Sequence, residues 1–243
     1  MHEYVFLGKI YPERVNFGLD SEIHIKHENP DFDIEGDIYV AFESSNMVAR
    51  YTSEKIYSSE KTGSLETLKN ILEEDIRLIV DIYCYVKSYS YDLEITRVVC
   101  KELNLDYTFG VQGEWNISKS KENTDKELNK IIMVLTDKKF SFLKYVFADF
   151  RRSIKYPVMT PSFCYRAIET LRKSYFEDSW DKLNSTLGFT KYDYGEILKF
   201  STPNRHGEYP GITYKQREKI MNFTRGVIDS FLNHVTANSL VST

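Results

Sequence analysis

Apolar and polar residues alternate in short runs along the first sixty positions of the chain. YVFLGKI at 4–10, SEIHIKH at 21–27 and GDIYVAF at 36–42 place apolar side chains at every second position, and MVARYTSEKIY at 47–57 continues the pattern. Segments that contain Pro, Gly, Asn and Asp separate these runs. Because successive side chains of a strand point to opposite faces of a sheet, the alternation predicts antiparallel strands with one buried face.

The period changes to that of a helix after Gly63. Ser64 is a suitable N-cap residue, and apolar residues then recur at helical spacing, at positions 65, 68, 71, 72, 76, 79 and 80. This pattern predicts one helix over about 65–87. YDLEITRVVC at 91–100 and DYTFGVQGEW at 106–115 again have the character of strands. Residues 1–118 therefore predict an α/β domain in which one long helix packs on a sheet.

The charged stretch SKSKENTDKE at 118–127 has no apolar anchor and is the best candidate for a linker. After this stretch, apolar residues recur at helical spacing. Thr124 and Glu127 form a capping-box pattern, Thr160 and Pro161 predict a helix start, and Thr213 with Gln216 predicts another capping box.

The other helical segments are 140–156, 179–188, a turn or two within 191–201, and a last helix over about 214–235 that is followed by a frayed tail. Residues 119–243 are thus expected to form an antiparallel helical bundle. The predicted fold class is α+β: an N-terminal antiparallel sheet with one long helix, then the bundle.

Composition limits the classes of function. The net charge of −4 argues against a protein that coats nucleic acid without specificity, although a local basic site stays open. The three cysteines, Cys84, Cys100 and Cys164, are expected to be reduced and buried. The N-terminus lacks the pattern of a secretion signal, and the most apolar stretch, 76–86, is about half the length of a membrane span. We therefore expect a cytoplasmic protein with no membrane segment.

The motif NRHG at 204–207 carries the clearest candidate chemistry. It is predicted to lie in a polar loop just before the helix start at Thr213, where the positive end of a helix dipole attracts phosphate. An imidazole at His206 can transfer protons near neutral pH, and a guanidinium at Arg205 can hold a phosphate. The alternative is a structural turn in which Arg205 pairs with Glu208 or Glu196.

The chain from about 124 to 237 resembles the HEPN superfamily, in particular its Apea-like and related bacterial groups. The resemblance rests on YRAIETLRKSYF at 165–176, SWDKLNSTL at 179–187, NRHG, and the long final helix. Many HEPN proteins are dimeric, metal-independent ribonucleases that carry an Arg four to six residues before a His. The resemblance implies an RNA-binding homodimer formed through the bundle, with roles such as phage defence, toxin–antitoxin systems or stress response.

The expected HEPN arginine is absent. If His206 is the family histidine, the arginine belongs at 199–201, where this sequence has Lys, Phe and Ser. Lys199 carries the charge at the longest allowed spacing but lacks the planar fork of arginine. The candidate catalytic residues are His206, Arg205, Asn204 and Lys199.

Basic residues gather on two helices of the predicted bundle. They could form an RNA-binding face with Tyr156, Tyr165 and Tyr175 as stacking partners, or simply a solvated surface. The candidate RNA-binding residues are Arg151, Arg152, Lys155, Arg166 and Arg172. Trp180 is expected to be a core residue.

No other segment has the spacing of a metal or cofactor site. His24 and His27 lie three apart on a predicted strand, so they are expected to be exposed on opposite faces and to share no metal. No cofactor is expected. The edge of the N-terminal sheet could accept a strand from a protein partner. Two hypotheses follow: an RNA-binding HEPN-like protein that also cleaves RNA, and a non-catalytic interaction module.

Overall fold

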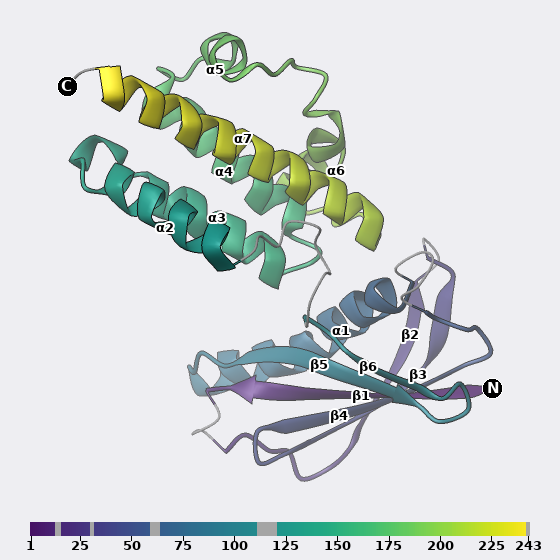
Figure 1. Cartoon of the computed structure of the whole chain (residues 1–243). Helices are drawn as coiled ribbons and strands as arrows, with labels where there is room; N and C mark the ends of the chain where they lie inside the picture. The colour runs from purple at the N-terminus through teal and green to yellow at the C-terminus, as the bar shows by residue number, and fades with distance from the viewer. Residues whose placement is uncertain (13–15, 30–31, 59–63, 111–120, 242–243) are drawn as a thin grey trace. The chain divides into compact units, whose positions relative to one another are not determined.

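The computed structural model describes residues 1–12, 16–29, 32–58, 64–110 and 121–241 (Figure 1). The chain divides into two compact units, Met1–Glu114 and Trp115–Thr243. The first contains a sheet and the second contains helices, so the predicted α+β class is confirmed. The predicted boundary at 118/119 lies within 111–120, outside the described residues.

The first unit, here called the sheet unit, contains six strands in the order β2-β3-β4-β1-β5-β6. All neighbouring strands are antiparallel. Their bounds are β1 His2–Tyr11, β2 Ile23–Asn29, β3 Ile34–Glu43, β4 Asn46–Ser53, β5 Asp92–Cys100 and β6 Leu105–Thr108.

Helix α1 (Ser64–Lys87) covers one face of this sheet, in agreement with the predicted helix (Figure 1). Its buried stripe meets the inward side chains of the strands. Tyr4, Phe6 and Ile10 of β1 alternate with exposed or half-buried neighbours, as the period of a strand requires. The main contributors from the helix are Leu65, Leu68, Leu72, Ile76 and Val80.

Charged side chains of α1 bond to backbone groups of β5 in the section of β5 that does not pair with β6. β6 pairs with β5 only over Arg97–Cys100, and the preceding section of β5 faces α1 side chains instead. Arg77 donates a hydrogen bond to the Leu93 carbonyl at 2.8 Å, and Glu73 accepts one from the Ile95 N–H at 3.4 Å. Arg77 also pairs with Glu73 at 2.6 Å and with Asp92 at 2.5 Å. The buried ion pair thus satisfies backbone groups that a strand would otherwise bond.

The expectation that both histidines of β2 are exposed is wrong for His27. His24 is exposed, bonds to Asp37 at 2.6 Å and stacks on Tyr39. His27 is only 7% exposed, and its Nδ1 bonds to Asp75 of α1. Period-two alternation correctly separates the two side chains onto opposite faces, but it does not show that α1 covers one of them.

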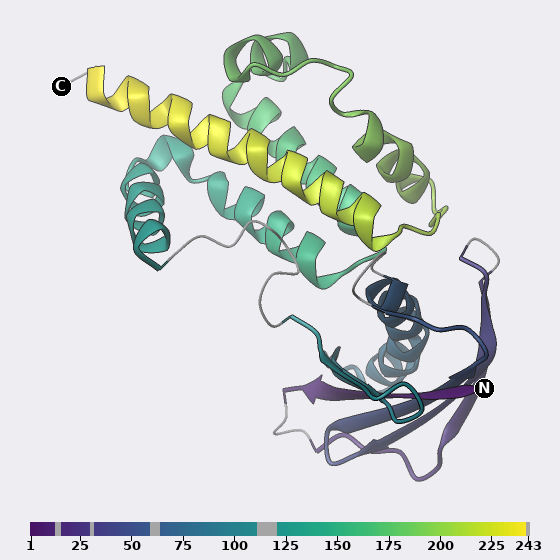
Figure 2. The ribbon, with the colours of Figure 1, turned by 45° about the vertical axis from the view of Figure 1, so that its right-hand side comes forward.

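The second unit, here called the helical unit, is a bundle in which α7 runs along α4 and α3 packs against α4 (Figures 1 and 2). Its apolar core includes Leu143, Ile168, Leu171, Ile220 and Phe231. The elements are α2 Lys121–Leu135, the short 3-10 helix η2 Lys138–Phe140, α3 Leu143–Lys155, α4 Thr160–Tyr175, α5 Trp180–Leu187, α6 Gly195–Arg205 and α7 Tyr214–Val241.

The predicted helix ends are partly confirmed. Thr213 and Gln216 form the predicted capping box: Thr213 Oγ1 accepts from the Gln216 N–H at 3.2 Å, and Gln216 Oε1 accepts from the Thr213 N–H at 2.9 Å. However, α7 continues to Val241 rather than ending near 235. α2 begins at Lys121, so part of the predicted linker is helical, while the side chain of Thr124 lies outside the described residues.

Thr160 does not cap α4, because Met159 occupies the N-cap position. The Thr160 hydroxyl instead donates to the Ser153 carbonyl at 2.6 Å and accepts from Arg217 Nε at 2.8 Å. Arg217 of α7 also donates to the carbonyls of Ser153 and Ile154, in the last turn of α3. A buried guanidinium thereby binds the negative end of a helix, which ties α3, α4 and α7 together.

The cysteines are free thiols: Cys100 and Cys164 are buried and Cys84 is partly buried. Burial raises the pKa of the Cys164 thiol to about 11, so it stays protonated at neutral pH. None of the helices in the described part of the chain has the length and apolar character needed to cross a membrane. In that same part, no group of three or more His, Cys, Asp or Glu side chains could hold a metal ion.

Candidate nucleic-acid interface

Arg205 and His206 lie at the end of a helix rather than in a loop, which corrects the sequence prediction. Helix α6 extends through Arg205, and His206 is its C-cap, with its N–H directed to the carbonyls of Pro203 and Asn204. Residues 207–213 separate it from α7. The nearest helix end is therefore the negative one of α6, which favours cations and not phosphate.

Asn204 and Lys199 have different surroundings. Asn204 is 6% exposed and its Nδ2 donates to the Val158 carbonyl at 3.2 Å, so it joins the end of α6 to the segment before α4. Lys199 is exposed, with its ammonium 5.3 Å from the centroid of the Phe200 ring. Asn204 is thus a structural residue rather than a catalytic one.

The two adjacent residues at the end of α6 face different directions. At about 100° per residue, Tyr194, Leu198 and Arg205 share one side of the helix, and Lys199 and His206 share another. The Arg205 guanidinium lies 4.8 Å from the centroid of Tyr165 on α4 and is 3.4 Å from the Thr202 hydroxyl. The expected pairing of Arg205 with Glu208 or Glu196 is not found among the described residues. Arg205 instead belongs to an aromatic surface.

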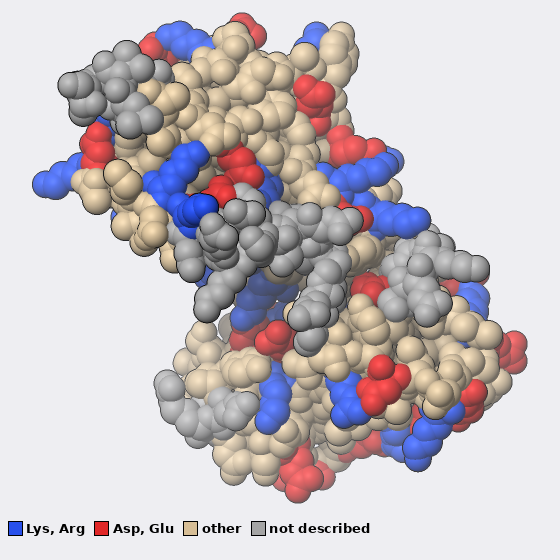
Figure 3. Space-filling view, viewed as in Figure 1, with Lys and Arg blue, Asp and Glu red and all other residues tan. Residues whose placement is uncertain are grey.

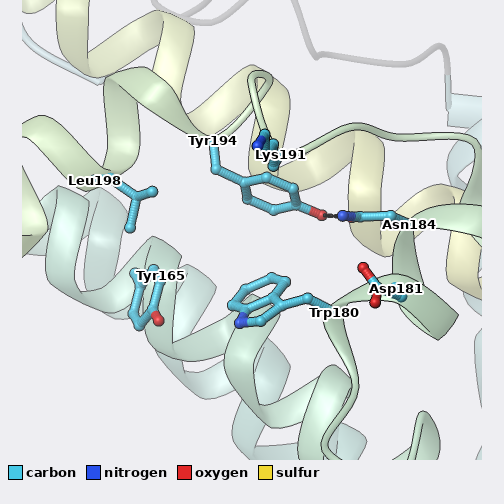
Figure 4. A pocket seen from close by; sticks show the side chains of 7 residues that line it. All are labelled: Tyr165, Trp180, Asp181, Asn184, Lys191, Tyr194 and Leu198. Atoms are coloured by element: carbon cyan, nitrogen blue, oxygen red, sulfur yellow. Dashed lines mark hydrogen bonds between the residues drawn. The ribbon is translucent and has the colours of Figure 1, made fainter.

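This surface is the rim of a pocket of about 310 Å³ between α4, α5 and α6 (Figure 4). Tyr165 and Leu198 lie at one end and Asp181 and Asn184 at the other, with Trp180 and Tyr194 between them. Lys191 completes the lining. We call these seven residues the aromatic pocket.

The aromatic rings of the pocket hold one another in place. The Trp180 centroid is 5.1 Å from that of Tyr194 and 6.1 Å from that of Tyr165. The Tyr194 hydroxyl donates to Asn184 Oδ1 at 2.8 Å, and burial raises the pKa of Tyr194, which keeps it a neutral donor. Trp180 is half-buried: it packs against the apolar core, as expected, and it also lines the pocket.

Cations surround the aromatic pocket. The Arg172 guanidinium lies 4.9 Å from the Trp180 centroid and is held by Asp178 at 2.8 Å and Glu169 at 3.4 Å. Arg205 lies over Tyr165, and Lys191 belongs to the lining. The lining contains a single carboxylate, that of Asp181. The carboxylates of Asp178 and Glu169 are held by Arg172, which leaves Arg205 and Lys191 as the cations here that pair with no described carboxylate.

The remaining predicted RNA-binding residues are largely occupied by ion pairs. Arg166 forms a bidentate ion pair with Asp149. Asp149 also pairs with Arg152 at 3.0 Å. The hydrogen bonds that Arg166 donates to Asp149 are the main cause that raises the pKa of Arg166. Arg151 is exposed, and Lys155 lies over the Tyr156 ring. On the face drawn in Figure 3, positive and negative side chains are interspersed, which gives no broad basic field.

Comparison with known families gives a match for both units. Residues 4–109 match the N-terminal domain, and residues 128–236 the C-terminal domain, of a domain of unknown function, DUF8168. The chain belongs to the DUF8168 family. No curated protein and no solved structure matches it.

The DUF8168 description does not mention HEPN, so the HEPN resemblance stays a prediction. The matched C-terminal domain contains the whole aromatic pocket together with Arg205 and His206. The DUF8168 N-terminal domain contains the strands and α1 of the sheet unit.

Proposed function

We propose that the helical unit binds single-stranded RNA in the cytoplasm, with an unstacked base in the aromatic pocket. The observation that carries the proposal is the pocket itself: three aromatic side chains line it, and Arg205 lies on the Tyr165 ring at its rim. Single-stranded RNA is bound by this combination, because each base has an apolar face that stacks on aromatic rings while the backbone attracts cations.

The size and charge of the pocket fit this ligand. A volume of about 310 Å³ is at the lower end of the range for small-molecule pockets, and is suited to one base rather than a large cofactor. The pocket does not suit a cationic ligand, because guanidinium groups already lie over Trp180 and Tyr165. A local site of this kind is compatible with a net charge of −4.

RNA cleavage by His206 is the catalytic extension of the proposal. His206 is exposed at the end of α6, on the same side as Lys199 and about 100° around the helix from Arg205. A backbone that follows Arg205 would pass beside it. In the HEPN scheme the ribose 2′-oxygen loses its proton to a base and attacks the adjacent phosphorus, and the bond from phosphorus to the 5′-oxygen breaks. The histidine moves these protons, so that the leaving 5′-oxygen departs as a hydroxyl and a 2′,3′-cyclic phosphate is left, while the cation stabilises the charge that develops on the phosphate oxygens.

The test is a binding and cleavage assay with one labelled, unstructured RNA. We expect binding by the wild type in EDTA and loss of affinity for Tyr165→Ala and Arg205→Ala. Affinity should be unchanged for the control Arg225→Ala, a half-buried residue of α7 that pairs with Asp229. Cleavage in EDTA that His206→Ala abolishes would establish the catalytic extension. Wild-type protein that neither binds nor cleaves RNA would refute the proposal.

A second candidate function is protein association through the helical unit. α2 exposes an apolar stripe in which Leu128, Ile132 and Met133 are 53%, 50% and 74% exposed. Because exposed apolar side chains at helical spacing mark association surfaces, this stripe favours the homodimer implied by the HEPN resemblance. Sedimentation of wild type and of Ile132→Glu distinguishes a dimer from a monomer, and a wild-type monomer would contradict it.

In the sheet unit, the surface proposed for a protein partner is the edge of β2. β2 pairs with β3 along its whole length and is the terminal strand of the sheet order. A terminal strand presents backbone N–H and C=O groups that an extended peptide can bond.

A further inference from the structure

Resting on the proposed RNA binding, we propose that the aromatic pocket selects guanine and that Asp181 is the residue that reads it. Asp181 lies in the first turn of α5 and its side chain lines the pocket. It is exposed and forms no ion pair with any described residue. Its two carboxylate oxygens are therefore acceptors available to a ligand.

Guanine matches a carboxylate better than the other bases do. Its Watson–Crick edge carries two adjacent donors, N1–H and the N2 amino group, which fit the two oxygens of one carboxylate. Adenine and cytosine place a ring-nitrogen acceptor beside their amino donor, and uracil flanks its N3–H with two carbonyls. Each of these bases would turn at least one acceptor toward the negative charge.

The layout of the pocket sets the direction of the base. Asp181 and Asn184 are at one end and Tyr165 is at the other (Figure 4). The Arg205 guanidinium lies over the Tyr165 ring. In a purine nucleotide the Watson–Crick edge and the ribose are on opposite sides of the base. A guanine that stacks along Trp180 with its edge toward Asp181 therefore directs its ribose and phosphate toward Arg205.

A neighbouring polar group supports this orientation. The Asn184 carbonyl oxygen is occupied by the Tyr194 hydroxyl, which leaves the amide nitrogen as the donor at this end of the pocket. Guanine O6 is an acceptor next to N1–H, so one base can use both the Asp181 carboxylate and the Asn184 amide. No other RNA base presents this order of one acceptor and two donors.

The experiment uses seven-residue oligouridylates that carry G, inosine, A, C or U at the centre. The chain has two tryptophans, so Trp115→Phe makes Trp180 the sole indole and its fluorescence the readout. We expect the G oligonucleotide to bind roughly tenfold more tightly than A, C or U. Inosine, which lacks the N2 amino group, should fall between G and A.

Asp181→Asn separates the carboxylate from the rest of the pocket. The amide replaces one acceptor with a donor, so the variant should lose the preference for G and keep its affinity for A, which also shows that it is folded. Glu196→Gln is the matched control, because Glu196 is an exposed carboxylate of α6 that does not line the pocket. It should leave the preference unchanged.

The outcomes distinguish the two proposals. Equal binding of all five oligonucleotides would overturn guanine selection and leave RNA binding intact. A preference for G that survives Asp181→Asn would also overturn the assignment to Asp181. Absence of binding by every oligonucleotide would refute RNA binding and guanine selection together.

Discussion

Two arginines, one from each unit, have opposite surroundings. In the sheet unit, Arg77 is buried between Glu73 and Asp92 and bonds to the backbone of β5. In the helical unit, Arg205 is exposed at the end of α6, over the ring of Tyr165 at the rim of a pocket. A buried guanidinium held by two carboxylates and a backbone carbonyl stabilises a fold, whereas an exposed one on an aromatic ring is accessible to a ligand. This difference is why we assign ligand binding to the helical unit.

The largest expected effect is the loss of Arg77. Arg77→Met would leave Glu73 as a buried carboxylate that keeps only its pair with Lys69, and would remove a donor from the Leu93 carbonyl. Removal of one partner from a buried pair costs about 3–5 kcal/mol. Urea denaturation, followed by signals from the sheet unit, measures this change in the free energy of unfolding.

The matched control for this change is Arg97→Met on the same sheet. Arg97 pairs with Asp106 at the surface, where water and salt screen the interaction, so the effect should be far smaller. Equal losses of stability in the two variants would contradict the structural role given to Arg77.

The next largest effect is expected for Arg217, the buried arginine of the helical unit. Arg217→Met removes donors from Thr160 and from two carbonyls at the end of α3. It should cost about 2–3 kcal/mol, because a hydrogen bond to a charged group contributes about 1.5–3 kcal/mol and bonds made by one guanidinium do not add. Arg225→Met is the control, because Arg225 of the same helix is only half-buried and pairs with the single carboxylate of Asp229. Thermal unfolding of the helical unit provides the comparison.

Arg205→Ala should instead leave stability almost unchanged and weaken RNA binding. An exposed cation–π contact contributes about 0.5–1 kcal/mol, so the free energy of unfolding should change by no more than that. RNA affinity should fall about tenfold, because the base loses the cation beside its phosphate. A large loss of stability would show that Arg205, like Arg77, mainly stabilises the fold, and would contradict the difference drawn between the two arginines.

The smallest effect is a dependence of stability on pH at Glu74. Burial is the main cause that raises the pKa of this carboxyl above its ordinary value of 4.5. The folded state therefore holds the proton more tightly than the unfolded state, and stability falls as pH rises from below 4.5 through the raised pKa. Glu74→Gln should remove this fall, as measured by urea denaturation between pH 4 and 7.

Most of the fold could be predicted, because the spacing of apolar residues within each segment indicates whether that segment is a strand or a helix. Alternation and the apolar stripe predicted the strands and α1, and the Thr213 capping box lies where its sequence pattern indicates. Interactions between distant segments were not predictable. Nothing near Thr160 in the sequence shows that Arg217 occupies its hydroxyl, and nothing near His27 shows that Asp75 covers it.

The candidate site was predictable only in part. Arg205, Tyr165 and Arg172 are candidates from the sequence, but the sequence pattern predicts a loop at Arg205, whereas α6 extends through Pro203 to Arg205. Pro203 lacks the N–H that would bond to the Lys199 carbonyl, yet α6 continues for two more residues, which the sequence does not indicate. The shared side of Tyr194, Leu198 and Arg205 becomes visible once α6 is extended to 205, and this spacing is the signal that would have revealed the pocket.

The central claim is that an unpaired base enters the aromatic pocket of the helical unit. The most direct measurement is the fluorescence of Trp180 in the Trp115→Phe protein during titration with a single-stranded RNA heptamer that contains guanine. We predict saturable quenching that Tyr165→Ala weakens and that the control Arg225→Ala leaves unchanged. A signal that stays flat, while the protein remains folded, would contradict the account.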